Sequence, residues 1–328
     1  FIENDWDKAV QKAKAENKLI FVDAYTTWCG PCKMLTRTTF KDEKVGEYFN
    51  ERFVNLKMDM EKGKGVSLGS TYNVRAYPTL LFLDAEGREI HRALGYHDVN
   101  QIFEFAKAIG DPDKQSSSMS EKYNNGTRDP EFLATYAEQL AELSDPKSFE
   151  VIEQFLNTQS DWNSERNMHF VLLMIEQPQG KYFDYFTKNR QNFDVAFGKE
   201  EMNNLFQTTV MNSLYDGEEL KSPEQAKPIL QKYFSNEWKS IFPKYKMTYY
   251  KRKGDTTNFA LTAQEYYNKA KIQNAQELNE IAWTFYTDID DNKMLKDAAK
   301  WAEKSVKLDD QYYNNDTVAA LYYKIGNK

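Results

Sequence analysis

The chain has 328 residues, of which 41% are hydrophobic and 15% aromatic, so it can build real hydrophobic cores, and its length favours two domains over one. The formal net charge of −7 argues against a nucleic-acid partner, because no basic excess exists to neutralise phosphate groups. No apolar run approaches the ~20 residues of a membrane-spanning helix, so we expect no membrane span in this chain.

The first 109 residues alternate between helical and strand-like hydrophobic patterns. In chain order they predict a helix over 5–16, a strand over 19–25, helices over 30–40 and 42–49, a strand over 53–60, a short helix over 66–72, strands over 79–83 and 89–94, and a helix over 98–109. Strands that alternate with helices and close with a hairpin predict an α/β domain whose mixed central sheet is covered on both faces.

The rest of the chain has a different character. Residues 110–119 are rich in Gly, Asp, Pro and Ser, which predicts a linker. From 120 to 328 helical periodicity predominates and predicts an all-α domain. Weak self-similarity over 245–328, with a period near the ~34 residues of tetratricopeptide repeats, predicts stacked helical hairpins. For 120–245, divergent repeats and a plain helical bundle both remain open.

Both cysteines of the chain lie in one tetrapeptide, Cys29-Gly30-Pro31-Cys32, between a predicted strand and a predicted helix. A thiol at a helix N-terminus faces unpaired backbone N–H groups and the positive end of the helix dipole, and both favour the reactive thiolate. A second thiol three positions further on can close a disulfide within the first turn. The motif therefore predicts reversible two-electron thiol–disulfide exchange.

Zinc sites also use paired cysteines, but they need two further ligands. The three histidines, His91, His97 and His169, form no pair at zinc-ligand spacing and are interpreted as incidental surface residues. We therefore expect no metal and no other cofactor. A passive disulfide or two inert thiols is the remaining structural alternative.

Three segments together resemble the thioredoxin family, in the family's order and spacing, over about a third of the chain: Phe21-Val22-Asp23, Trp28-Cys29-Gly30-Pro31-Cys32-Lys33 and Ala76-Tyr77-Pro78-Thr79. The resemblance implies a thioredoxin fold over 1–109 and exchange with protein disulfides and a thiol electron donor. It also implies that Cys29 is the more exposed, attacking cysteine and that Cys32 is buried and resolves the mixed disulfide. Gly30-Pro31 is the insert of the reductases in this family.

Asp23 lies within an apolar strand, where an ionised carboxylate is costly to bury. A raised pKa would suit it to move the proton of Cys32, which is the role that the resemblance implies. A strand-end carboxylate that faces solvent is the alternative. The family usually carries a Lys near this acid, and here we expect Asn55 at that strand position, with Lys57 two residues further along the same face.

The resemblance implies a substrate-binding rim around the cysteines. It predicts a cis Tyr77–Pro78 bond, with the Tyr77 backbone left to pair with an extended substrate, whereas a trans Pro at a strand start is the alternative. Trp28 is expected to cover the site, or to be a core aromatic. Gly95 is expected to keep the opposite rim open, or to be a turn glycine. Gly30 and Pro31 complete the predicted substrate-binding set.

One departure from thioredoxin bears on location. Arg37 stands where thioredoxins carry a helix-kinking Pro, and the patterns around Phe40 and Phe53 look more like the C-terminal domain of the thiol:disulfide interchange proteins. Those domains work outside the cytoplasm, so the resemblance implies a periplasmic or secreted protein, with a cytoplasmic one as the alternative. The sequence begins with Phe1 and not with Met, so a signal peptide that preceded Phe1 remains an alternative.

Three functions compete on these grounds. The leading hypothesis is a thiol–disulfide oxidoreductase, acting as a reductase, whose helical domain selects the partner. An interaction or scaffold protein with a redox-gated docking module is the alternative, since stacked helical hairpins form concave peptide-binding surfaces. An oxidase or isomerase would run the same exchange in the other direction.

Overall fold

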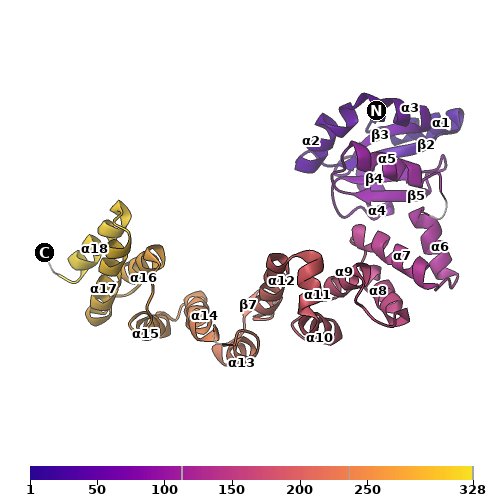
Figure 1. Cartoon of the computed structure of the whole chain (residues 1–328). Helices are drawn as coiled ribbons and strands as arrows, with labels where there is room; N and C mark the ends of the chain where they lie inside the picture. Colours follow the sequence, from indigo (N-terminus) through magenta and orange to yellow (C-terminus); the bar gives the residue numbers. More distant parts are fainter. Residues whose placement is uncertain (112–113, 236, 327–328) are drawn as a thin grey trace. The chain divides into compact units, whose positions relative to one another are not determined.

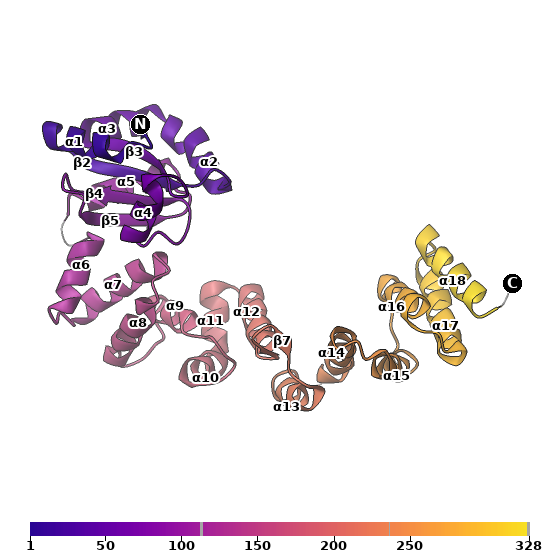
Figure 2. The same ribbon diagram turned by 180° about the vertical axis from the view of Figure 1, so that it is seen from behind.

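The chain forms two compact units, Phe1–Met174 and Ile175–Lys328, in a computed structural model that describes residues 1–111, 114–235 and 237–326 (Figures 1 and 2). This division differs from the predicted boundary at 110–119, because the helices that directly follow the sheet belong to the first unit. Residues 112 and 113 of the predicted linker, and 236, 327 and 328 of the predicted all-α domain, lie outside the described residues.

The first unit begins with the predicted α/β domain. Its elements are β1 (Ile2–Glu3), α1 (Trp6–Glu16), β2 (Leu19–Tyr25), α2 (Gly30–Arg37), the 3-10 helix η1 (Thr39–Lys41), α3 (Glu43–Arg52), β3 (Phe53–Asp59), α4 (Lys64–Thr71), β4 (Thr79–Leu83), β5 (Glu89–Leu94) and α5 (Val99–Ala108). The five strands have the order β1-β3-β2-β4-β5, with β2 parallel to β3 and antiparallel to β4. The predicted mixed central sheet is confirmed.

Successive side chains of β2 point to opposite faces of the sheet, so this strand contributes to two separate layers of the core. Ile20, Val22 and Ala24 pack with buried residues of α1 and α4, whereas Phe21 packs with buried residues of α2, α3 and α5. Helices therefore cover both faces of the sheet. Asp23 shares the second face with Phe21, since alternate residues of a strand point to the same side. The strand thus directs one carboxyl group toward the face that α2 covers.

The helix that carries the cysteines is shorter than the predicted span of 30–40. It ends at Arg37, and a single 3-10 turn follows. Thr38 caps the end, because both its backbone N–H and its hydroxyl donate to Met34 O, at 2.9 and 2.8 Å. The Thr39 hydroxyl donates to His97 O at 2.7 Å, which fixes the turn to the loop before α5.

Four helices complete the first unit: α6 (Ser116–Asn124), α7 (Pro130–Glu142), α8 (Lys147–Thr158) and α9 (Glu165–Leu173). α6 begins inside the predicted linker and is fixed to β5, where the Ser117 hydroxyl donates to Ile90 O at 2.9 Å and the Ser116 N–H donates to His91 Nδ1 at 3.2 Å. His91 is therefore buried rather than on the surface as expected, and burial lowers its pKa to about 4.

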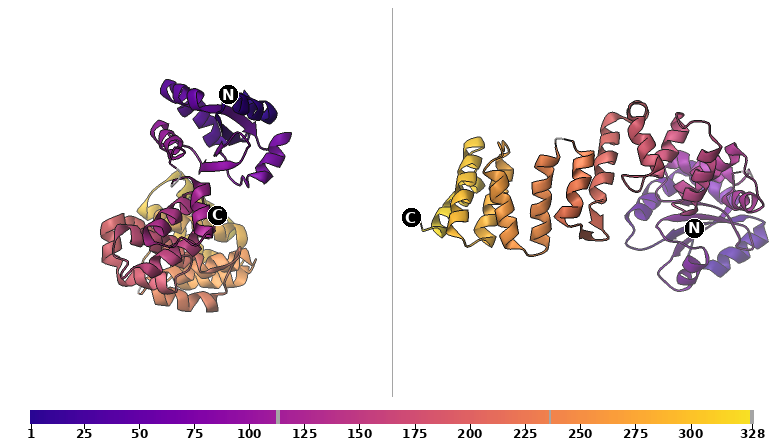
Figure 3. Two further views of the ribbon diagram at one scale, coloured as in Figure 1. Left: turned by 90° about the vertical axis from the view of Figure 1, so that its right-hand side faces the viewer. Right: turned by 90° about the horizontal axis from the view of Figure 1, so that it is seen from below.

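The second unit is helical, apart from a short ribbon that the sequence did not predict. Its elements are α10 (Lys181–Lys188), α11 (Arg190–Phe197), α12 (Lys199–Asn212), β6 (Tyr215–Asp216), β7 (Glu219–Leu220), α13 (Pro223–Tyr233), α14 (Trp238–Arg252), α15 (Thr256–Tyr267), α16 (Ala275–Asp288), α17 (Asn292–Leu308) and α18 (Tyr312–Lys324). Successive helices, orange to yellow in Figure 3, lie side by side. The assignment of these hairpins as tetratricopeptide repeats stays a prediction.

Candidate active site

The two cysteines form a disulfide at the start of α2, with their Cα atoms 5.4 Å apart. Cys29 is the N-cap residue of the helix, and its Sγ accepts the Cys32 backbone N–H at 3.1 Å. Pro31 occupies the first turn, where its missing N–H leaves no hydrogen bond unmade. A donor at the helix start thus already points at the Cys29 sulfur, and the same contact would stabilise a thiolate there.

The exposure of the cysteines differs from what the resemblance implied. Cys29 and Cys32 are equally buried, at 2% exposure each, so Cys29 is not the more exposed residue in this disulfide form. The covalent bond holds the two sulfurs together, and the Cys29 sulfur lies against the backbone of the first helical turn. Gly30, between them, is exposed, and a Cβ built on it would meet no atom within 4 Å.

Trp28 lies on the surface beside the disulfide and is held there by two contacts. It is 65% exposed, which excludes a role as a core aromatic. Its indole N–H donates to both carboxylate oxygens of Glu61, at 3.0 and 3.1 Å, and its ring meets Tyr77 edge-on, with the ring centroids 5.9 Å apart. Trp28 therefore joins the segment after β3 to the segment before β4. Glu61 was not among the predicted site residues, because no local pattern in the sequence marks this contact.

Two further predicted rim residues, Tyr77 and Pro78, lie before β4, and a third, Gly95, lies just after β5. The Tyr77–Pro78 peptide bond is cis, Tyr77 is half-buried, and the Pro78 carbonyl accepts the Gly95 N–H at 2.8 Å. Gly95 has a φ of +84°, which other residues rarely adopt, and open space where a side chain would begin. The turn therefore requires glycine at this position, and its role at the substrate rim stays a prediction.

Asp23 is fully buried, and neither of its carboxylate oxygens accepts a hydrogen bond from the described residues. Burial raises the pKa of Asp23 to about 7, and the nearby charge of Lys57 offsets part of that effect. Lys57 Nζ lies 3.9 Å from Asp23 Oδ2. A solvent-facing carboxylate is thus excluded, and this carboxyl group can gain or lose a proton near neutral pH.

The residue beside Asp23 on the neighbouring strand is Lys57 and not Asn55. The parallel register of β2 and β3 pairs Asp23 with Lys57, whereas Asn55 pairs with Phe21 and donates its side-chain amide to Asn50. The expectation that Asn55 takes the place of the family lysine was wrong, since the pairing starts with Leu19 beside Phe53. The charged partner of Asp23 is present in this chain.

Lys57 links the buried carboxyl group to the second cysteine. Its ammonium donates to the Thr36 hydroxyl at 2.6 Å, and that hydroxyl donates to Cys32 O at 3.1 Å. Cys32, Thr36 and Lys57 also line one cavity of about 250 Å³ beneath the start of α2, which is large enough to hold water. Cys32 and Lys57 therefore face the same cavity, and Thr36 was not among the predicted site residues.

Within the described part of the chain, no three His, Cys, Asp or Glu side chains gather into a group that could hold a metal ion. Nor is any helix of that part both long and apolar enough to cross a bilayer.

We expect the substitution Asp23→Asn to stabilise the oxidised protein more at high pH than at low pH. The folded-state pKa of about 7 lies above the unfolded value, so the buried carboxyl group carries no penalty below the unfolded pKa. The penalty grows as pH rises from there and is complete once pH exceeds about 7. The gain in the free energy of unfolding caused by Asp23→Asn should be larger at about pH 8 than at about pH 4, by at most about 4 kcal/mol. Urea unfolding of the full chain at both pH values measures it.

The matched control is Glu47→Gln, which makes the same carboxyl-to-amide change at an exposed position of α3. It should show no such pH dependence. An effect of Asp23→Asn that is equal at both pH values would mean that the carboxyl group titrates like an exposed one.

Comparison with known proteins places the first domain in a family. A family model described as thioredoxin-like matches residues 2–85. Thioredoxin-1 of Drosophila melanogaster is 38% identical over 80 residues, which are 24% of this chain and 68% of that protein. The thiol:disulfide interchange protein DsbD of Tatumella citrea is 36% identical over 99 residues, which are 29% of this chain and 17% of that protein's length.

A solution structure from Bacteroides thetaiotaomicron, of a protein provisionally named a disulphide-isomerase, is 49% identical and covers 34% of this chain and 92% of its own, with a TM-score of 0.32. The cysteine pair lies inside the segment matched by the family model. The match to the Drosophila thioredoxin extends over two thirds of that protein's length. The chain therefore belongs to the thioredoxin-like family, and its N-terminal domain is a disulfide oxidoreductase module of that family.

Proposed function

We propose that the chain is a thiol–disulfide oxidoreductase that reduces protein disulfides, with Cys29 as the attacking residue. The observation that carries this proposal is the place of Cys29 as N-cap of α2, with the Cys32 N–H directed at its sulfur. In the reduced protein this donor and the helix dipole favour the Cys29 thiolate, which is the nucleophile of disulfide exchange.

The reaction then has two steps. The Cys29 thiolate attacks one sulfur of a substrate disulfide, a mixed disulfide forms, and the other substrate sulfur leaves as a thiolate. Deprotonated Cys32 next attacks the Cys29 sulfur, which closes the Cys29–Cys32 disulfide and releases the second substrate thiolate. Two electrons pass to the substrate, and the two departing thiolates take up protons. A thiol electron donor returns the disulfide of the protein to the dithiol.

Asp23 is the proposed acceptor of the Cys32 proton. Its pKa of about 7 lies below that of an ordinary thiol, yet is high enough for the carboxyl group to give the proton up again near neutral pH. Lys57 stands between Asp23 and the cavity that Cys32 lines, so a proton can reach water from this side of the site. Charge on Lys57 keeps the carboxylate form available, since it counteracts the effect of burial.

The rim beside the disulfide is the proposed substrate contact. Trp28 and Tyr77 supply apolar surface next to Cys29, and we propose that the Tyr77 backbone pairs with an extended segment that flanks the substrate disulfide. We propose that the helical domain, predicted over 120–328, selects the partner protein. Relatives named thiol:disulfide interchange protein support a periplasmic or secreted location, and thioredoxins among the relatives support the cytoplasmic alternative.

Insulin reduction by dithiothreitol tests the exchange. The full chain should accelerate it, and Cys29→Ser should return the rate to that of dithiothreitol alone, because the attacking sulfur is lost. Cys32→Ser should accumulate a covalent adduct with an insulin chain, visible by mass spectrometry, because nothing resolves the mixed disulfide. Ser67→Ala, on the exposed side of α4, is the control and should behave as wild type.

A Cys29→Ser variant as active as the wild type would contradict the proposal. If such a variant still captured the same partners, the interaction-protein alternative would account for the chain better.

The direction of exchange is tested by the reduction potential of the Cys29–Cys32 pair. We expect a potential near that of thioredoxin, roughly −270 mV, because the Gly30-Pro31 insert is of the reductase type. Equilibration of the full chain in glutathione buffers, followed by thiol alkylation and mass analysis, gives the value. A potential close to the roughly −120 mV of a strong oxidant would overturn the reductase assignment.

A further inference from the structure

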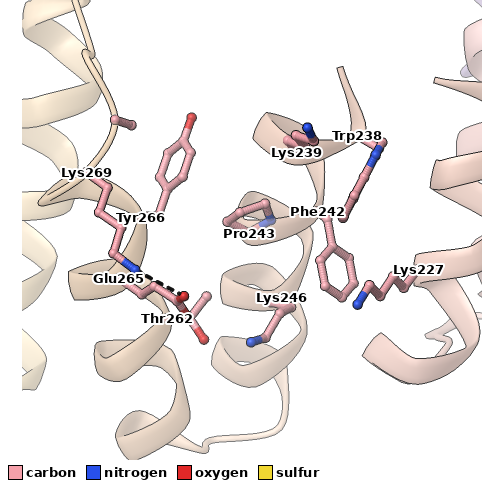
Figure 4. A pocket seen from close by; sticks show the side chains of 11 residues that line it. Lys227, Trp238, Lys239, Phe242, Pro243, Lys246, Thr262, Glu265, Tyr266 and Lys269 are labelled. Carbon is pink, nitrogen blue, oxygen red and sulfur yellow. Dashed lines mark hydrogen bonds and ion pairs between the residues drawn. The ribbon is translucent and has the colours of Figure 1, made fainter. Parts of the chain in front are cut away.

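A hollow of about 410 Å³ lies among α13, α14 and α15 of the second unit, far along the sequence from the cysteines (Figure 4). We call it the lysine pocket, after its four lysines: Lys227, Lys239, Lys246 and Lys269. Every lining residue belongs to the helical unit, and the redox chemistry described above uses none of them.

The charge of the lysine pocket is opposite to that of the whole chain. Four lysines and one carboxylate, Glu265, line it, which leaves an excess of three positive charges in a chain of formal net charge −7. Glu265 pairs with Lys269 at 3.5 Å, whereas Lys227, Lys239 and Lys246 have no ion pair within 4 Å among the described residues.

A second carboxylate, Glu224 of α13, lies near the pocket without lining it. Its pKa is lowered mainly by the hydrogen bond with Ser222, and Lys246 contributes least of the four effects that act on it. Glu224 is thus no ion-pair partner of Lys246 within 4 Å in the described part of the chain.

Aromatic rings form the apolar part of the same hollow. Trp238, Phe242 and Tyr266 line it and are each partly exposed. Lys227 Nζ lies 5.9 Å from the ring centroids of both Trp238 and Phe242, so one ammonium group stands over two rings. The pocket thus combines apolar contact area with positive charge at its edges.

The arrangement of the ammonium groups distinguishes between anionic ligands. In Figure 4 the lysines come from α13, from α14 and from the segment after α15, and they lie on different sides of the aromatic rings, so their ammonium groups do not converge on one point. A single phosphate needs donors that converge on it. Separate charges around an apolar centre instead suit carboxylates spaced along a peptide, with an apolar side chain between them.

We propose that the lysine pocket binds an acidic peptide segment of a partner protein, one that carries an aromatic or aliphatic side chain between carboxylates. The apolar side chain contacts Phe242 and Tyr266, and the flanking carboxylates pair with the lysines. Binding of this kind depends on attraction to the local positive charge of the pocket and weakens as salt screens it. The proposal deepens the partner-selection part of the proposed function and depends on it for its biological use.

The test uses the full chain and a fluorescein-labelled synthetic peptide of alternating Glu and Gly residues with one central Phe and no Cys. Fluorescence anisotropy should show binding that weakens with added sodium chloride. Lys227→Glu/Lys246→Glu should reduce the affinity by about tenfold or more, since each reversal turns an attraction into a repulsion. Replacing the peptide's Phe with Gly should also weaken binding.

The matched control is Lys293→Glu/Lys296→Glu, which changes the net charge equally at exposed positions of α17 outside the pocket. It should leave the affinity within about twofold of wild type, since distant exposed charges are screened. Lys227→Gln/Lys246→Gln should give an intermediate loss, and circular dichroism checks that all variants are folded.

Equal losses in the pocket and control variants would overturn the proposal, as would the absence of binding. Displacement of the peptide by inorganic phosphate at equal concentration would also overturn it, in favour of a phosphate site. Because the peptide has no cysteine, these outcomes are independent of insulin reduction, and a failure of one proposal is distinguishable from a failure of the other.

Discussion

The parallel pairing of β2 with β3 sets Asp23 opposite Lys57 on the face of the sheet that α2 covers. A carboxyl group in this position is fully buried and accepts no hydrogen bond from the described residues, and a single ammonium group 3.9 Å away counters its loss of hydration. Stability alone would favour an apolar residue here. A buried acid whose pKa is raised to about 7 is instead typical of a site that moves protons.

Cys29 and Cys32 depend on different elements of the fold for their proposed roles in the exchange. The start of α2 acts on Cys29, whose sulfur faces a backbone donor and the positive end of the helix. Lys57 and Thr36 act on the other side, where they connect the buried carboxyl group to the cavity beside Cys32. In the proposed mechanism the sheet therefore supplies the proton acceptor, and the helix supplies the nucleophile. Trp28, held by Glu61 and Tyr77, is the proposed surface for substrate contact.

Local patterns in the sequence identified strands β2 to β5, the cysteine pair at a helix start and Asp23 within an apolar strand, because each depends on neighbours in the chain. They did not identify Lys57 as its partner, since strand register is set by pairing between distant segments. The Glu61 contact and the attachment of α6 to β5 are equally non-local. The lysine pocket combines residues of three helices, so no single stretch of sequence marks it.

The central claim is that Asp23 titrates near neutral pH and that Lys57 holds its pKa down. Carbon NMR of the oxidised full chain, labelled at aspartate side-chain carboxyl carbons and titrated with acid, measures this most directly. The account predicts a carboxyl signal with a pKa of about 7 in the wild type, and a higher pKa in Lys57→Met, where the counteracting charge is gone. An Asp23 signal that titrates near the ordinary aspartate value of about 4, or one that Lys57→Met leaves unchanged, would contradict it.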